Sequence, residues 1–279
     1  MKTTNYMEEA EIVIIGGGIG GLATALALHK KGLESVVLER SESIRTTGSA
    51  IGIFSNGWRA LDQLGVGAQL RPRAVPFTAL LNISLNDGKQ EEIPLREEAR
   101  CLKRNDLVQV LADSLPPNTV RFGCHILAVK LDPVTSQPIL QLQDGNTIKA
   151  KVVIGCDGPV RGHLLIQEFP ANPNSSKNRP SSPSLISQQN LLEIVKKCDL
   201  DSLTLTRIRY RTPWDILLGN FRKGTVIVAG DAMHIMGPFL GQGGSAALED
   251  AVVLARNLAQ AMSMKGSEII DKQNYAGEH

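Results

Sequence analysis

The first forty residues combine two apolar runs with a glycine-rich segment between them. Residues 12–15 form a short β-branched run, and five of the six residues from 16 to 21 are glycine. Apolar residues then recur at helical spacing, at Leu22, Ala23, Leu26 and Ala27. A second apolar run follows at residues 35–39. This order predicts a βαβ unit of about 30 residues, with two parallel strands and a right-handed crossover.

The rest of the pattern predicts further strands and helices. Alternation from residue 77 to 95, broken by a turn at 86–88, is typical of a hairpin, and residues 105–115 have the pattern of a helix. Apolar runs at residues 151–155 and 225–229 indicate buried strands. A strand-like stretch also runs from 203 to 210. A last helix is predicted from about Ser245, with an apolar stripe formed by Leu248, Ala251, Val252, Ala255, Leu258, Ala259 and Met262.

Composition changes sharply in the middle of the chain. Twelve of the fifteen residues from 170 to 184 are Pro, Ser or Asn. Such a segment cannot bury enough apolar surface to offset the entropy of ordering it. We therefore expect a mobile loop at residues 170–184.

Overall composition narrows the function classes. The chain has 279 residues, 42% of them apolar, and a formal net charge of +2, so a disordered protein and nucleic-acid binding through a basic surface are not expected. Four scattered cysteines suggest neither a metal site nor disulfides, but reduced thiols and a cytoplasmic location. The 17 uncharged residues from 12 to 28 contain the glycine cluster, so we expect no transmembrane segment and no cleaved leader.

The glycine cluster carries the first chemical motif. Gly16, Gly18 and Gly21 form G-x-G-x-x-G where the first strand becomes a helix, and Glu39 stands 23 residues after Gly16 at the tip of the second strand. Glycines allow a tight turn and let a pyrophosphate approach backbone N–H groups, while the carboxylate accepts hydrogen bonds from a ribose. The motif predicts a dinucleotide site for FAD or NAD, and Glu39 disfavours the 2′-phosphate of NADP.

A second motif separates FAD from NAD. Asp231 follows the apolar run at 225–229, and a loop with Pro238, Gly241, Gly243 and Gly244 leads into the last helix. A helix start offers unpaired N–H groups and a partial positive charge, which suit an anion or the electron-rich pyrimidine edge of a reduced flavin. An NAD enzyme needs no such second site, so FAD is the expected cofactor.

With these motifs the sequence resembles the class A flavoprotein monooxygenases of the salicylate hydroxylase, zeaxanthin epoxidase and urate hydroxylase kind, and most of all their plant members. The resemblance rests on GGGIGG with Glu39, GCDG at residues 155–158 and GDAMHIMGPFLGQGG at residues 230–244. It implies that Asp231 binds the ribityl chain and that Pro238 and residues 241–244 line the isoalloxazine. It also implies cofactor contacts from Arg40, Arg45, Arg104 and Asp157.

The resemblance implies a fold and a reaction as well. The fold would be α/β, a three-layer FAD-binding Rossmann-like domain with a parallel sheet and a reduced, interwoven antiparallel β substrate region. NAD(P)H would reduce the FAD, and one atom of O2 would enter a small organic substrate, aromatic or isoprenoid-like, while the other leaves as water. The FAD-binding parts would be residues 1–75, 101–161 and 214–265, the substrate region 76–100 and 162–213, and the tail 266–279.

Three departures from the family pattern leave an alternative open. The family's Ser after the Asp-Gly motif is missing, since Pro159, Val160 and Arg161 follow Gly158. Asp157 and Asp231 are only 74 residues apart, so the chain looks shortened in the substrate region, and it also lacks the family's C-terminal helices. The alternative is therefore a non-catalytic or uncoupled FAD-binding remnant that releases peroxide. The substrate, the choice of NADH or NADPH and the oligomeric state stay open.

Three further side chains are candidates for a role in chemistry. His234 follows Asp231 closely enough to approach a flavin, but a lone loop histidine is expected to be structural. Trp58 and Trp214 are expected to anchor packing rather than to stack on a ligand. No catalytic triad or carboxylate pair is indicated, as expected where the cofactor performs the chemistry.

Overall fold

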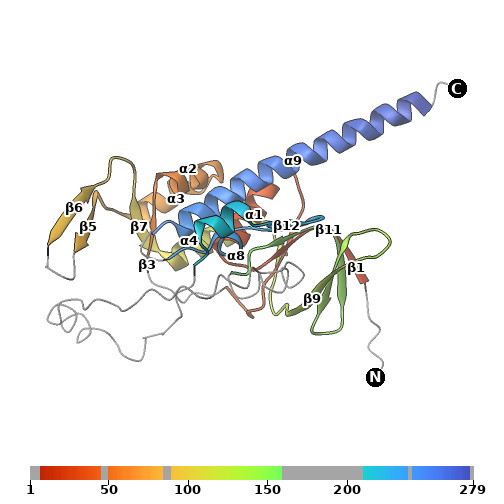
Figure 1. The fold of residues 1–279 in the computed structure, drawn as a ribbon, viewed down its shortest axis with the longest axis horizontal. Helices are drawn as coiled ribbons and strands as arrows, with labels where there is room; N and C mark the ends of the chain where they lie inside the picture. Colours follow the sequence, from red (N-terminus) through yellow and green to blue (C-terminus); the bar gives the residue numbers. More distant parts are fainter. Residues whose placement is uncertain (1–6, 45–49, 84–88, 159–209, 238–240, 277–279) are drawn as a thin grey trace.

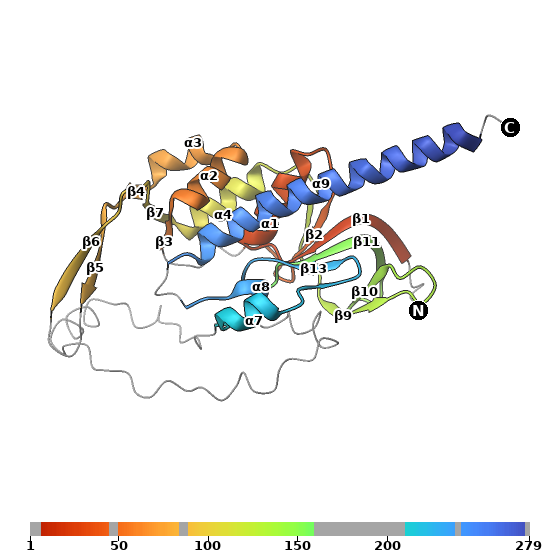
Figure 2. The ribbon, with the colours of Figure 1, turned by 45° about the horizontal axis from the view of Figure 1, so that its top comes forward.

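The computed structural model describes residues 7–44, 50–83, 89–158, 210–237 and 241–276. Its main sheet has the order β12-β13-β11-β1-β2-β8, and all of these strands except β12 run parallel to their neighbours. Helices α1, α2, α4 and α9 cover one face, and β9, β10 and α8 lie on the other side (Figures 1 and 2). The fold is therefore α/β with a mainly parallel sheet, as predicted.

The strand ends of the main sheet decide where a ligand can bind. Its strands are β1 (Met7–Ile15), β2 (Val36–Leu38), β8 (Val120–Arg121), β11 (Thr147–Gly155), β12 (Arg222–Lys223) and β13 (Val226–Val228). Strands β9 (Ile126–Leu131) and β10 (Pro138–Leu142) continue the sheet from β11 as an antiparallel ladder. Ile15 pairs with both Leu38 and Gly155, and Gly155 pairs with Val228. Four parallel strands thus end at one edge of the sheet.

The two faces of the sheet belong to two separate apolar cores. Ile12 and Ile14 of β1 pack into the core shared with the helices, whereas Val13 and Ile15 pack into the core beneath β10 and α8. Alternate side chains of a strand point to opposite faces, so a strand covered on both sides must be apolar throughout. This explains the continuous apolar runs of the sequence.

Helix α1 (Ile19–His29) is buried along nearly its whole length. It lies between β1 and β2 on one side and α9 (Gly243–Ala276) on the other, so no side of it is polar. The remaining helices are α2 (Ser55–Gln63), α3 (Gly67–Leu70), α4 (Arg104–Asp113), α7 (Pro213–Leu218) and α8 (Asp231–His234), with a 3-10 turn at Arg71–Arg73. Figure 2 shows α9 crossing the helix layer and continuing past the rest of the molecule.

Two small antiparallel sheets flank this body. One joins β3 (Ala50–Ile53), β7 (Arg100–Lys103) and β4 (Val75–Pro76), and the other pairs β5 (Ala79–Ile83) with β6 (Gln90–Pro94). The second is the hairpin predicted between residues 77 and 95, with Leu80 opposite Ile93. Its turn, the loop predicted at 170–184 and residues 203–209 of the strand predicted at 203–210 fall outside the described residues.

The two tryptophans differ in their surroundings. Trp58 is fully buried, donates a hydrogen bond of 3.0 Å from Nε1 to the carbonyl of Ile53 and lies 5.0 Å below the guanidinium of Arg71, so it is the predicted packing anchor. Trp214 is 70% exposed on α7, and the same prediction is wrong there. The capping box of Thr212 and Asp215 fixes the start of α7. Trp214, on the first turn of this helix, belongs to neither apolar core.

None of the helices in the described ranges combines the length and the apolar character needed to cross a membrane. The long helix α9 carries charged side chains such as Glu249 and Asp250 on its first turns.

Candidate cofactor site

A cavity of about 470 Å3 lies at the edge where the parallel strands end. Its walls come from seven separate parts of the chain: the β1–α1 turn, the end of β2, β3, the start of α4, the residues at the start of β9, the end of β11, and residues 229–237 with 241–247 between β13 and α9. Ligands of open α/β sheets bind in such a crevice. Ten of the predicted site residues line it: Gly16, Gly18, Glu39, Arg40, Arg104, Asp157, Asp231, Gly241, Gly243 and Gly244.

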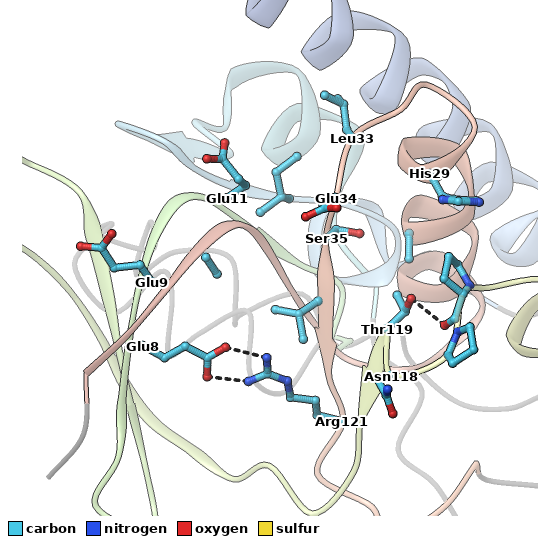
Figure 3. A pocket seen from close by; sticks show the side chains of 16 residues that line it. Glu8, Glu9, Glu11, His29, Leu33, Glu34, Ser35, Asn118, Thr119 and Arg121 are labelled. Atoms are coloured by element: carbon cyan, nitrogen blue, oxygen red, sulfur yellow. Dashed lines mark hydrogen bonds and ion pairs between the residues drawn. The ribbon is translucent and has the colours of Figure 1, made fainter.

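A larger cavity of about 610 Å3 opens at the other end of the sheet, between the first half of β1 and the start of β2 (Figure 3). Polar side chains such as Glu8, Glu9, Glu34 and Arg121 line it, and Glu8 and Arg121 pair with each other through two hydrogen bonds of 2.6 Å. It contains none of the predicted site residues. We place the functional site in the smaller cavity, because the two glycine motifs meet there.

The three glycines of the first motif serve different purposes. Gly16 has φ +103°, and a Cβ on it would lie 2.8 Å from the carbonyl oxygen of Cys156. A Cβ on Gly21 would overlap the carbonyl oxygen of Gly16. These two glycines are needed for the turn and for the close packing of α1 on β1. A Cβ on Gly18, in contrast, would meet nothing within 4 Å.

Gly18 therefore keeps space open in the cavity. It is the N-cap of α1 and makes no side-chain capping hydrogen bond, so the first turn of α1 presents its backbone N–H groups without competition from a cap. A pyrophosphate fits such a site because the amides and the helix dipole both favour an anion. The cradle left by the missing side chain is the observation that fits the cofactor to these residues.

Glu39 is held in place by two backbone amides. Its Oε2 accepts a hydrogen bond of 2.6 Å from the Gly17 amide, its Oε1 accepts one of 2.9 Å from the Ser41 amide, and the residue is only 3% exposed. The carboxylate thereby ties the end of β2 to the glycine turn. In a dinucleotide site of this kind, ribose hydroxyls are the donors whose hydrogen bonds such a carboxylate accepts.

Two of the three predicted arginines lie at this cavity. Arg40 follows Glu39 directly, and Arg104 is the first residue of α4. Both reach the cavity from the side of β2 and β7, where a guanidinium can bind a diphosphate with two parallel hydrogen bonds. Arg45 lies outside the described residues, so its contact remains a prediction.

The second glycine motif begins the opposite wall. Gly230 ends the turn after β13 with φ +61°, and Asp231 opens α8. A Cβ on Gly243 would lie 3.8 Å from Oδ1 of Asp231, so this carboxylate stands beside the start of α9. The helix begins at Gly243, two residues before the predicted Ser245, because the glycine loop itself enters the first turn. Pro238 lies outside the described residues, and its contact also remains a prediction.

The two glycine motifs both lie next to the side chain of Ala247. A Cβ on Gly20 would lie 3.7 Å from the β-carbon of Ala247, and one on Gly230 would lie 3.5 Å from the same atom. The first turns of α1 and α9 are therefore neighbours, and both helix starts face one cavity. An extended dinucleotide can reach both of them at once.

The end of β11 supplies Cys156 and Asp157. Desolvation raises the pKa of the Cys156 thiol to about 12, so the thiol stays neutral and is a poor nucleophile at neutral pH. Asp157, from the GCDG motif, lines the cavity beside Gly16. This wall therefore offers polarity and shape but no nucleophile, in keeping with chemistry carried by a cofactor.

His234 is buried, and it does not line the cavity. Its Nε2 lies 2.6 Å from Oδ2 of Asp250 on α9, and the same oxygen accepts a hydrogen bond of 2.8 Å from the Gly230 amide. The hydrogen bond to Asp250 raises the pKa of His234 and favours the imidazolium. The placement agrees with the expectation from the sequence that His234 has a structural role. Asp250 was not singled out from the sequence.

The chain matches a known protein family and several known relatives. A family described as "FAD binding domain" matches residues 9–172 and 163–275. "Monooxygenase 1" of Arabidopsis thaliana is 44% identical over 326 residues, which cover 95% of this chain and 82% of the relative. "3-hydroxybenzoate 6-hydroxylase 1" of Aquipseudomonas alcaligenes is 26% identical and covers 90% and 81%. An alignment of 326 residues exceeds the 279 of this chain, so the plant relative has segments without a counterpart here.

Solved structures share the fold at low sequence identity. The urate-bound complex of Klebsiella pneumoniae HpxO with FAD has a TM-score of 0.70 at 20% identity, over 90% of this chain and 80% of that one. P. aeruginosa PqsL in complex with 2-aminobenzoylacetate has a TM-score of 0.72 at 20% identity, over 92% and 88%. The TM-scores establish the shared architecture, whereas identities of 20% leave the substrate open.

Proposed function

Since this chain belongs to the family of FAD-dependent monooxygenases, we propose that it uses NAD(P)H and O2 to insert one oxygen atom into a small organic substrate of aromatic or isoprenoid-like character. The observation that carries the proposal is the joint cavity, in which the starts of α1 and α9, three carboxylates and two arginines surround one space. FAD is the cofactor, and the chain is an oxidoreductase.

Each wall of the cavity has a separate task in this proposal. The amides of the first turn of α1 would bind the pyrophosphate in the space left by Gly18, and Arg40 and Arg104 would neutralise its charge. Glu39, oriented by its two amides, would accept the ribose hydroxyls. Asp231 would accept a ribityl hydroxyl, and the start of α9 would stabilise negative charge at the pyrimidine edge.

When bound, FAD supplies the transfer of electrons from NAD(P)H to O2. The protein's own part is to hold the ring system against the β13–α9 wall and to keep water away from its substrate side. The names of the relatives favour a monooxygenase over a peroxide-releasing remnant. In the described part of the chain, the free thiols of Cys101, Cys124 and Cys156 are consistent with a reducing compartment, and we propose the cytoplasm.

The decisive experiment measures coupling. The purified chain should carry a flavin spectrum, and NADPH consumption, peroxide release and product formation should be recorded with phenols and heteroaromatic compounds. Product in proportion to NADPH supports the proposal. Peroxide in proportion to NADPH with every substrate supports the uncoupled remnant instead, and a chain without flavin contradicts both.

Asp231→Ala should raise the dissociation constant of FAD at least tenfold. A hydrogen bond from a ribityl hydroxyl to a carboxylate contributes about 1.5–3 kcal/mol, which corresponds to a factor of ten or more. The dissociation constant is measured by quenching of flavin fluorescence. Asp113→Ala, which removes an exposed carboxylate at the end of α4, is the matched control and should leave it unchanged. Equal affinities of the two variants would show that Asp231 does not contact the cofactor.

A further inference from the structure

We propose that Asp250 is a positioning residue of the flavin site, which acts through Gly230 and His234 to fix the direction in which Asp231 faces the cavity. This inference rests on the proposed role of Asp231 in binding FAD. Asp250 itself lies on α9, outside the walls of the cavity. It therefore contributes through the groups it holds and not by contact with the cofactor.

One carboxylate oxygen holds the chain on both sides of Asp231. Oδ2 of Asp250 accepts the hydrogen bond from the amide of Gly230, one residue before Asp231, at 2.8 Å. The same oxygen lies 2.6 Å from Nε2 of His234, three residues after it. The short helix α8 is thus attached at both ends to a single atom, and Asp231 lies between the two attachments.

The backbone at Gly230 shows why such an attachment is needed. Gly230 has φ +61° and ψ −142°, a conformation that glycine adopts far more readily than other residues, so the turn after β13 has considerable freedom of its own. The amides of Met233 and His234 both donate to the carbonyl of Gly230 and close the turn from one side. The hydrogen bond from the Gly230 amide to Asp250 fixes the preceding peptide plane, between Ala229 and Gly230.

The spacing along α9 connects this pair to the cavity. Gly243, Ala247 and Asp250 are separated by four and three residues, so they lie on one face of the helix. This face meets the β13–α8 turn at three successive points: Oδ1 of Asp231 near Gly243, Gly230 near Ala247, and Gly230 with His234 at Asp250. The helix whose start would face the flavin therefore also orients the carboxylate that would bind its ribityl chain.

Burial makes the pair at Asp250 strong enough for this purpose. The side chain of His234 is 10% exposed and that of Asp250 is 23% exposed, so solvent screens their interaction less than that of a surface ion pair. Because His234 is directed at Asp250 and does not line the cavity, it is also a positioning residue and not a catalytic one.

A double-mutant cycle on FAD affinity tests the proposal. Asp250→Ala removes both attachments and should raise the dissociation constant of FAD about tenfold. The same substitution in an Asp231→Ala background should change it less than threefold, because Asp250 acts through Asp231. A merely structural residue would weaken binding by the same factor in both backgrounds. That result, or an unchanged affinity of Asp250→Ala, would overturn the proposal.

Milder variants keep the test decisive if Asp250→Ala fails to fold. Asp250→Asn retains a carbonyl oxygen that can accept both hydrogen bonds but removes the negative charge that favours the imidazolium of His234, so its dissociation constant should lie between those of the parent and of Asp250→Ala. His234→Gln, which retains a side-chain donor, should bind FAD more tightly than His234→Ala. Both pairs are placed in the same cycle with Asp231→Ala. An additive effect of both conservative variants would refute the positioning role.

Glu8→Gln is the matched control for the loss of an ion pair between a carboxylate and a cationic side chain. It removes the charge of Glu8 and one of its two oxygen acceptors for Arg121 at the opposite end of the sheet (Figure 3), so it should leave the affinity for FAD unchanged. The cycle measures FAD binding alone, whereas the proposed function is measured by product formation. A chain that binds FAD, shows the expected cycle and forms no product would contradict only the proposed function.

Discussion

Gly18→Val should abolish the retention of FAD while the apoprotein remains folded. The backbone at Gly18 has φ −84° and ψ −171°, which is extended and open to valine, and a Cβ there meets no atom within 4 Å. The new side chain would fill the space in which the pyrophosphate approaches the first turn of α1. We expect the dissociation constant of FAD to rise at least about a hundredfold, or ~2.7 kcal/mol.

Two measurements separate this loss of binding from a loss of fold. FAD content after gel filtration and titration by flavin fluorescence report binding, and the melting temperature of the apoprotein reports the fold. Valine is a poorer N-cap than glycine, so the apoprotein should melt only a few degrees lower, in line with about 1 kcal/mol. Gly52→Ala, in β3 and with ordinary contacts to Phe54 and Phe77, is the control and should retain FAD. Normal flavin content of Gly18→Val would move the pyrophosphate site away from α1.

The βαβ unit could be predicted because its signals are local. The runs at residues 12–15 and 35–39 are apolar on both faces, and the strands β1 and β2 are indeed covered by a core on each side. Glycine interrupts the pattern where the backbone needs it, at Gly16 with φ +103°. A local sequence pattern suffices where the neighbouring residues along the chain determine the conformation.

The candidate site could be predicted in outline for a related reason. Parallel strands end at the same edge, so Glu39, Asp157 and Asp231 had to converge once their strands were identified. That these residues bind FAD stays a prediction, to be tested by the variants above. The motif does not show which glycine leaves room for the ligand and which is needed for the packing of the fold. That distinction depends on distances between atoms that are far apart in the sequence.

The contacts of Asp250 could not be predicted from periodicity. Asp250 and His234 are 16 residues apart and belong to different elements, and their pairing depends on how α9 crosses the β13–α8 turn. The spacing of Gly243, Ala247 and Asp250 on one helix face was the available signal. Trp214 illustrates the opposite error, because a large apolar side chain was expected to anchor packing, although Trp214, Leu217 and Leu218 are all more than two thirds exposed.

Gly21→Ala should destabilise the fold itself. A Cβ at this position would overlap the carbonyl oxygen of Gly16, a backbone atom that a rotamer change cannot move away. The overlap can therefore be relieved only if α1 moves away from β1, and α9, which packs against the other side of α1, opposes that movement. Overpacking of a core costs typically 1–3 kcal/mol, and we expect ~3 kcal/mol here because the overlap involves the backbone. For a chain of this size the melting temperature should fall by roughly 6–12 °C.

Gly20→Ala is the control that isolates this overlap. It adds the same methyl group one residue earlier in the same turn, where the nearest atom is the β-carbon of Ala247 at 3.7 Å, an ordinary contact. Alanine also favours a helix over glycine by about 1 kcal/mol, so this variant should melt at or above the temperature of the parent. The comparison is made on apoproteins by thermal unfolding, so that cofactor binding does not contribute. Equal melting temperatures of Gly21→Ala and Gly20→Ala would mean that α1 tolerates displacement from β1, and the close approach at Gly21 would then not be what the third glycine of the motif provides.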